Sequence, residues 1–310
     1  RATRAAYPRH PRRLAGLLAA TVALALLATA CGAPARAAST KGAPVVTVVT
    51  GLWPLQQAIA AIGQGNVRAV DVVPAGQDPR TWRLDGGARS RVRSADLVVE
   101  LGGGWQPTLT AAARGARHVL DLSRAIPHLP PYPWLNPYTM ESIARAIAAS
   151  LDRVDPQAKG TFANGEQDEQ ALLGSLDADF QSTLGSGGCA TQNLVNSDQA
   201  FTALDTRYQV HVVPIDGATP APFFPDKATV AHELQVVRRA GVHEIYYDTW
   251  QKQDGLLEVE AEAQVKLGTL DPLTGIPPGG WPKGLKSYLN LMEYDLGAIT
   301  NALGCPQPGL

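Results

Sequence analysis

One stretch in the middle of the chain, residues 136–184, constrains the fold most strongly. Asn136-Pro137 is a good helix start, because Asn accepts hydrogen bonds from the free N–H groups of a first turn and Pro tolerates the first helical position. Apolar residues then recur at the i, i+3, i+4, i+7 spacing of one helix face, Asp155-Pro156 interrupts them, and a second helical pattern follows. The apolar positions are Met140, Ile143, Ala144, Ile147, Ala148, Leu151 and Val154, then Phe162, Leu173, Leu176, Phe180 and Leu184.

Strand-like and helix-like segments alternate on both sides of this stretch. The strand-like runs are rich in β-branched residues, as in buried parallel strands. This alternation predicts an α/β protein of two lobes, each a parallel-rich sheet flanked by helices, bridged by one long helix with a binding cleft between the lobes. We expect an N-terminal lobe at 45–135, a helical connector at 136–185 and a C-terminal lobe at 186–310. The expected strands are 45–49, 67–73, 97–101 and 118–122, then 193–196, 210–215, 244–247 and 265–269.

The first 44 residues are typical of a targeting segment and a tether. Residues 1–13 carry five arginines, and the apolar residues 14–30 end in small side chains directly before Cys31. This pattern predicts a bacterial lipoprotein signal peptide at 1–30, cleaved so that Cys31 carries the lipid, followed by a flexible tether at 31–44. The alternative is an uncleaved N-terminal anchor, since 17 apolar residues are borderline for a membrane span.

Composition and charge limit the classes of function. The chain has 310 residues, 45% of them hydrophobic and 18% charged, which is enough for a large globular core. The formal net charge is −1, and removal of residues 1–30, with five Arg and no acid, makes it −1 − 5 = −6. A nucleic-acid partner is therefore not expected.

The cysteines divide into one lipid site and one pair. With Cys31 assigned to the lipid, Cys189 and Cys305 remain as an even pair in an oxidising compartment. We expect a disulfide between them, because bonds of this kind form and persist outside the cytoplasm.

Five ordered segments carry a family resemblance that covers about residues 45–303. They resemble, in turn, the motifs Asp-Pro-His-Thr-Tyr, His-x-Trp-Leu-Asp-Pro, His-Asp-Ala-Phe with Arg-Tyr, Leu-Asp-Pro-Leu, and the last helix of the metal-type (zinc and manganese) solute-binding proteins of ABC transporters. The segments are Asp78-Pro79-Arg80-Thr81-Trp82, Tyr132-Pro133-Trp134-Leu135-Asn136-Pro137, Asp198-Gln199-Ala200-Phe201 with Arg207-Tyr208, Leu270-Asp271-Pro272-Leu273, and Ser287-Tyr288-Leu289-Asn290-Leu291-Met292.

The resemblance implies a binding protein rather than an enzyme. It implies an extracytoplasmic monomer, held on the cell membrane through Cys31, that captures Zn²⁺ or Mn²⁺ between its lobes. The ion would be delivered to the permease and ATPase of a metal-type ABC importer.

The residues at the family's metal-ligand positions are nevertheless degenerate. They are Arg80, Tyr132, Asp198 and Asp271, of which only Asp271 is the family residue, while the carboxylate of Asp198 resembles that of manganese-type members. The phenol of Tyr132 is a poor ligand because it titrates near a pKa of about 10. Arg80 cannot be a ligand, since a protonated guanidinium has no lone pair to give.

Three interpretations of this cleft remain open. In the first, Arg80 forms a salt bridge with Asp198 or Asp271 in the metal's place, and the protein is a non-transport envelope lipoprotein that has kept the fold. In the second, Asp248 joins the remaining carboxylates and Tyr132 in an oxygen-rich site for Mn²⁺, Ca²⁺ or ferric iron. In the third, the cleft holds an organic ligand or a metal chelate against Trp82 and Trp250. His128, four residues before Tyr132, is a further candidate for the cleft.

Overall fold

The computed structural model describes residues 45–306 apart from 186, 198, 216–226 and 251–255. All the described residues lie in one compact unit, residues 43–310. The predicted signal peptide, the tether, Cys31 and Asp198 therefore lie outside the described residues. In the described part of the chain, no helix is long and apolar enough to cross a membrane.

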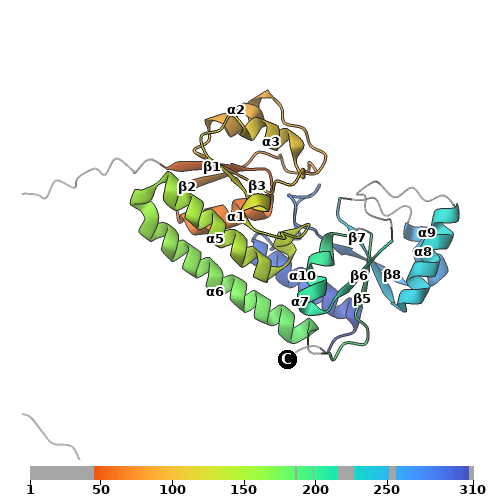
Figure 1. Ribbon diagram of the computed structural model, residues 1–310. Helices are drawn as coiled ribbons and strands as arrows, with labels where there is room; N and C mark the ends of the chain where they lie inside the picture. Colours follow the sequence, from red (N-terminus) through yellow and green to blue (C-terminus); the bar gives the residue numbers. More distant parts are fainter. Residues whose placement is uncertain (1–44, 186, 198, 216–226, 251–255, 307–310) are drawn as a thin grey trace, which may run out of the picture. The chain divides into compact units, whose positions relative to one another are not determined.

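The first lobe is a four-stranded parallel sheet of order β2-β1-β3-β4 (Figure 1). Its side chains alternate between two layers of helices, as the period of two of a strand requires. Val48 faces the layer that contains α1, whereas Val49 faces a separate core with α2 and α3. The elements are β1 (Val46–Thr50), α1 (Trp53–Gly63), β2 (Val67–Asp71), α2 (Gly86–Ser94), β3 (Leu97–Glu100), α3 (Pro107–Ala113), β4 (Val119–Asp121) and α4 (Leu122–Ala125).

The second lobe repeats this plan with a parallel sheet of order β6-β5-β7-β8. Leu194 packs on the layer that contains α10, and its neighbour Val195 packs on a separate core with α8 and α9. The elements are β5 (Asn193–Asn196), η3 (Ala200–Leu204), α7 (Asp205–Tyr208), β6 (His211–Pro214), α8 (Lys227–Ala240), β7 (Glu244–Asp248), α9 (Leu256–Ala263), β8 (Lys266–Leu270) and α10 (Tyr288–Leu303).

The connector contains two helices, α5 (Pro137–Val154) and α6 (Lys159–Leu184), joined by the short η2 (Pro156–Ala158). The predicted start is confirmed, since Asn136 Oδ1 accepts a hydrogen bond from the Thr139 amide at 3.3 Å. The two helices pack along one another, and α6 contacts α1 in the first lobe as well as α7 and α10 in the second (Figure 1). The long helix that bridges the lobes is therefore α6, while α5 packs on the first lobe.

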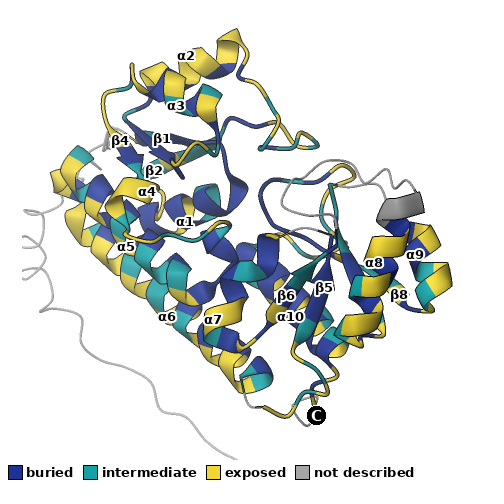
Figure 2. Cartoon of the chain, turned by 45° about the vertical axis from the view of Figure 1, so that its right-hand side comes forward, coloured by how far each residue is buried: buried dark blue, intermediate teal, exposed yellow. Residues whose placement is uncertain are grey.

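One hydrophobic core runs through the connector into both lobes, and Figure 2 shows segments of buried residues in dark blue inside segments coloured yellow as exposed. The approach of α6 to α1 depends on Gly165, because a Cβ there would come within 2.3 Å of the carbonyl oxygen of Ile62. At the far end of α6, the predicted Cys189–Cys305 disulfide is present. It links the segment after α6 to the end of α10.

Candidate functional site between the lobes

Strand ends and loops from both lobes meet in a polar cluster around Arg80. Arg80 lies in the loop after β2, and Tyr132 precedes the short helix η1 (Pro133–Leu135). From the second lobe, Asp248 is the last residue of β7 and Asp271 directly follows β8. Carboxyl ends of parallel strands are the usual binding positions of α/β sheets.

The Arg80 guanidinium joins the two lobes. Its Nη1 donates to Asp248 Oδ2 at 2.8 Å and to the Tyr132 hydroxyl at 3.3 Å, and its Nε donates to both oxygens of Asp78 at 2.9 and 3.0 Å. The Arg80 side chain is 8% exposed and that of Asp248 is 1% exposed. Charged hydrogen bonds of this forked kind are among the stronger ones in proteins.

Local backbone structure presents these side chains to one another. Asp78 Oδ1 also accepts from the Arg80 amide at 2.9 Å, so the turn through Pro79 is held by the same carboxylate that binds the guanidinium. Tyr132 has a φ of 49°, a left-handed conformation that is uncommon for residues other than glycine. Strain of this kind often occurs at functional sites.

An aromatic cluster supports Tyr132 from behind. The rings of Trp105 and Trp134 lie edge-on to Tyr132, with ring centroids 5.4 and 5.6 Å away. Trp134 Nε1 donates to the Pro272 carbonyl at 2.7 Å, which ties this cluster to the loop that carries Asp271. Trp134 is therefore a packing residue, whereas Tyr132 presents its hydroxyl to the cluster.

Asp271 is held in place but is not well suited to carry charge. Its carboxylate accepts from Thr249 Oγ1 at 2.7 Å and from the Leu273 amide at 2.8 Å. Burial raises the pKa of Asp271 to about 6, although these two hydrogen bonds and the charge of Arg80 oppose the rise. Behind it, buried Asp295 accepts from the Asp271 amide at 3.5 Å, and burial raises the pKa of Asp295 well above its ordinary value.

The electrostatic balance favours a resident guanidinium. Burial by itself lowers the pKa of Arg80, but the carboxylates of Asp248 and Asp78 outweigh it and the net pKa is raised. Within the described part of the chain, no group of three or more His, Cys, Asp or Glu side chains is placed to hold a metal ion. The degenerate ligand set is thus organised around an internal cation.

The structure brings together some of the residues expected from the sequence. Arg80, Tyr132 and Asp248 are in direct contact, and Asp271 lies close enough for Arg80 to lower its pKa. The described salt-bridge partners of Arg80 are Asp248 and Asp78. Of the two partners expected from the sequence, Asp271 is not among them, and Asp198 lies outside the described residues.

Of the other candidates, Trp250 adjoins this contact, because its backbone amide donates to Asp248 Oδ1 at 2.8 Å. His128 is exposed, and Trp82 packs on the outer core of the first lobe with α2 and α3. Trp250 is half-buried, and its Nε1 has no hydrogen-bond partner among the described residues.

The residues that the sequence analysis missed are Asp78, Trp105, Thr249 and Asp295. Asp295 had a signal, since it lies on the apolar face of the last helix at helical spacing from Met292 and Ile299.

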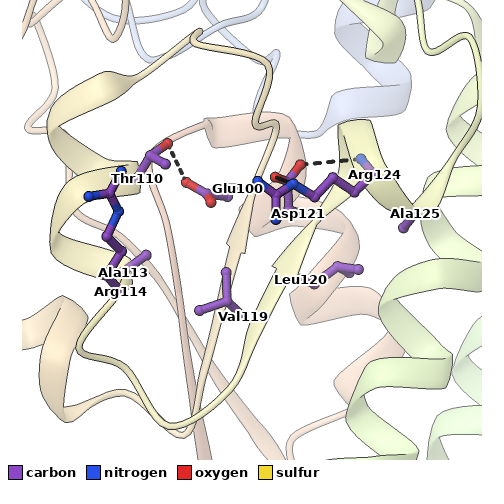
Figure 3. A pocket seen from close by; sticks show the side chains of 9 residues that line it. All are labelled: Glu100, Thr110, Ala113, Arg114, Val119, Leu120, Asp121, Arg124 and Ala125. Carbon is purple, nitrogen blue, oxygen red and sulfur yellow. Dashed lines mark hydrogen bonds and ion pairs between the residues drawn. The ribbon is translucent and has the colours of Figure 1, made fainter.

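A separate pocket of about 510 Å³ lies at the edge strand β4, between α3 and α4 (Figure 3). Three of its charged groups have partners, whereas Arg114 has no ion-pair partner among the described residues. Thr110 Oγ1 donates to the buried Glu100 at 2.6 Å, and Arg124 Nε lies 3.2 Å from Asp121. Glu100 thereby ties β3 to α3, and we assign the pocket no function.

Solved structures share this two-lobed fold. The Zn(II)-bound ZnuA-like domain of Streptococcus pneumoniae AdcA has a TM-score of 0.73 at 22% identity, covering 84% of this chain and 99% of that domain. The periplasmic zinc-binding protein TroA from Treponema pallidum has a TM-score of 0.72 at 19% identity, covering 85% of this chain and 100% of TroA. The chain therefore has the fold of these two proteins, two α/β lobes bridged by a long helix.

The sequence comparison identifies the family within this fold. Residues 48–302 match the family described as ZnuA, zinc-uptake complex component A, periplasmic, and the chain belongs to that family. The high-affinity zinc uptake system protein ZnuA of Bacillus subtilis is 22% identical over 308 residues, covering 90% of this chain and 94% of that protein. The zinc-binding lipoprotein AdcA of Streptococcus pneumoniae is 23% identical over 279 residues, covering 82% of this chain but only 55% of AdcA.

Proposed function

We propose that this protein is the extracytoplasmic, lipid-anchored solute-binding component of a ZnuA-type ABC importer, and that it captures a divalent cation, zinc or manganese, for delivery to a permease. The observation that carries the proposal is the cationic position that Arg80 occupies between the lobes, where it pairs with Asp78 and Asp248 and where its charge lowers the pKa of Asp271. The family membership and the zinc-related names of its relatives support a metal cargo.

In this proposal, cargo and Arg80 exclude one another. Two unit charges about 4 Å apart at an effective dielectric near 20 interact by about 4 kcal/mol, and a doubly charged ion beside the guanidinium would face about twice that repulsion. Capture therefore requires the Arg80 side chain to leave Asp248, which frees buried carboxylate oxygens of the kind that manganese prefers. The carboxylates act as ligands, and Arg80 keeps them paired until the ion arrives.

Calorimetric titration with ZnCl₂ and MnCl₂ tests this proposal on the wild type, Arg80→His and Arg114→Ala. Arg80→His restores a ligand type at the family position, and Arg114 is an exposed arginine of the first lobe. Stoichiometric binding by the wild type that strengthens in Arg80→His and is unchanged in Arg114→Ala supports metal capture at this cluster. Binding that is the same in all three proteins would place any metal elsewhere and overturn the assignment.

A second candidate is favoured by the Arg80–Asp248 contact itself, because a buried pair at 2.8 Å closes the cluster without a metal. Here the protein is an envelope lipoprotein that has kept the fold, and it acts through its surface or on an organic ligand. Absence of binding by the wild type, with binding gained in Arg80→His, would favour this candidate over metal import.

A further inference from the structure

The first lobe carries a charge of the opposite sign to the rest of the unit. Residues 45–135 hold nine arginines and no lysine against six acidic residues, a formal balance of +3. Residues 136–310 hold eleven basic residues against 22 acidic ones, a balance of −11. Although the net charge of the whole chain is small, the first lobe is therefore positively charged and the rest of the unit is strongly negative.

Most of the first lobe's arginines have no acidic partner among the described residues. Arg80, Arg117 and Arg124 form ion pairs with nearby aspartates. Within the described part of the chain, no ion pair involves the other six, and three of these lie on the nine-residue helix α2. The six are Arg68, Arg83, Arg89, Arg91, Arg93 and Arg114, and all are exposed.

Two neighbouring hollows concentrate this charge. One, of about 440 Å³, is lined by Arg89 and Arg93 together with small polar residues of α2. The other, of about 320 Å³, is lined by the same two arginines and by Pro107, Thr108, Ala111 and Ala112 of α3. Neither hollow has an acidic residue in its lining, in contrast to the pocket at β4 in Figure 3.

This face, which we define as the exposed arginines of α2 with Arg83 and Arg114, lies largely on the outer helix layer of the first lobe. Figure 2 shows α2 with an exposed outer side, and its buried residues are only Ala88 and Val92. Because α2 is fixed to the sheet by these two residues, Arg89 and Arg93, which are four positions apart, lie on the same side of the helix and line the same hollows.

We infer that this arginine face docks on an anionic phospholipid bilayer. The inference rests on the lipid anchoring proposed above, because the 14 residues from Cys31 to Pro44 would lead directly into β1 of this lobe. That length of chain spans at most about 50 Å, so the first lobe stays close to the membrane surface. Guanidinium groups bind lipid phosphates well, and the acidic second lobe is repelled by the same surface.

Such docking would orient the protein on the membrane. The basic lobe would face the bilayer, and the acidic lobe would be directed away from it. The attraction acts over about one Debye length, roughly 8 Å at physiological ionic strength, so it favours the orientation in which the basic lobe contacts the surface.

Vesicle co-sedimentation of the unit 43–310, which contains all described elements, tests the inference without the lipid anchor. The probes are vesicles of phosphatidylcholine with and without 40% phosphatidylglycerol. Basic residues near an anionic membrane each strengthen binding about fivefold, so Arg89→Ala/Arg93→Ala should weaken binding to anionic vesicles about 30-fold. Arg89→Lys/Arg93→Lys should retain most of the binding, and 0.5 M NaCl should abolish it.

The matched control is Arg238→Ala/Arg239→Ala, which removes two exposed arginines from α8 of the second lobe. This control should bind anionic vesicles like the wild type. The inference is overturned if the wild type binds anionic and neutral vesicles equally, or if both double alanine variants lose binding to the same extent. Because metal titration is expected to be unchanged in Arg114→Ala, a variant of this face, a failure here is distinguishable from a failure of the proposed function.

Discussion

Two arginine–aspartate contacts in this protein resemble each other chemically but differ in what they join. Arg207 binds Asp177 through Nε at 2.6 Å and through Nη2, and this links α7 to the bridging helix α6. Arg80 binds Asp248, 168 residues away in the chain, and links the first lobe to the second. The first contact lies beside the continuous core, and the second lies among loops at the ends of strands.

The surroundings of the two contacts also differ. Tyr208 donates its hydroxyl to Asp177 at 2.6 Å, and Arg207 lies 4.0 Å from the ring centre of Tyr138. Burial alone would raise the pKa of Asp177, but Arg207 and Tyr208 outweigh it and the pKa is lowered. Beside Arg80, burial prevails at Asp271 and the pKa is raised. The comparison suggests a permanent structural pair at Arg207 and an exchangeable one at Arg80.

The largest effect is expected from Asp177→Ala. The substitution removes the acceptor of Arg207 and leaves the buried Tyr208 hydroxyl only its longer contact to Asn136 Oδ1 at 3.3 Å. We expect a loss of about 3 kcal/mol in the free energy of unfolding, measured by urea denaturation. Asp179→Ala, at an exposed position of α6, is the control and should change stability by less than about 0.5 kcal/mol. A cost below about 1 kcal/mol at Asp177 would remove the contrast with Arg80.

Arg80→Ala should cost less, about 2 kcal/mol, although Arg80 is the more buried arginine. Asp248 loses its partner, but the cluster lies at strand ends, where water or a cation can replace the guanidinium. Addition of 1 mM MnCl₂ should therefore restore part of the lost stability in Arg80→Ala and none in Asp177→Ala. Equal responses of the two variants to the ion would contradict an exchangeable site at Arg80.

The sequence was sufficient to predict those elements whose structure depends on neighbouring residues in the chain. The cap at Asn136, the apolar face of α5 and the break at Asp155-Pro156 depend on neighbouring residues, and the structure confirms them. The two parallel sheets followed from the β-branched runs. The prediction that one long helix bridges the lobes is confirmed by α6, but periodicity did not show that α6 turns back along α5. Helix α3 was missed, although Pro107 occupies its first turn, where proline is favoured.

The site was less predictable because its contacts join residues far apart in the chain. The motifs identified Arg80, Tyr132 and Asp271 by position, but they did not show which carboxylate Arg80 binds. That choice depends on how the end of β7 lies against the loop after β2. Asp78 was overlooked because it belongs to the same motif as Arg80, where its turn-forming role hides its role as a partner.

Asp271→Asn tests whether the stability that Asp271 contributes changes with pH in the opposite direction to the stability that Asp177 contributes. A carboxyl whose pKa is raised from 3.8 to about 6 on folding contributes stability that is present below pH 3.8 and is lost as the pH rises through about 6. Relative to Asp271→Asn, the wild type should lose on the order of 1.5 kcal/mol in unfolding free energy between pH 4 and pH 7. Asp177, with a lowered pKa, acts in the opposite direction, since its stabilisation is lost only as the pH falls below 3.8.

Urea denaturation at pH 4, 5, 6 and 7 measures this difference for the wild type, Asp271→Asn and the exposed control Asp179→Asn. The control should follow the wild-type profile. Parallel profiles for the wild type and Asp271→Asn would mean that Asp271 is already ionised and paired in the folded protein. The site beside Arg80 would then resemble the site at Arg207, and the contrast between them would fail.

Tyr132→Phe should have the smallest effect on stability. It tests whether the Tyr132 hydroxyl is a weaker partner of the Arg80 guanidinium than Asp248 is. The Arg80–Tyr132 contact, at 3.3 Å, is longer than the Arg80–Asp248 contact at 2.8 Å, and the ring packing on Trp105 and Trp134 is retained. We expect a cost of about 0.5–1 kcal/mol, typical of one neutral hydrogen bond. Because loss of the hydroxyl would loosen Arg80 without removing a carboxylate, titration with MnCl₂ should show equal or tighter binding than in the wild type. Weaker binding would instead make the Tyr132 hydroxyl a ligand, and the site would then be an oxygen-rich metal site with Arg80 at its edge.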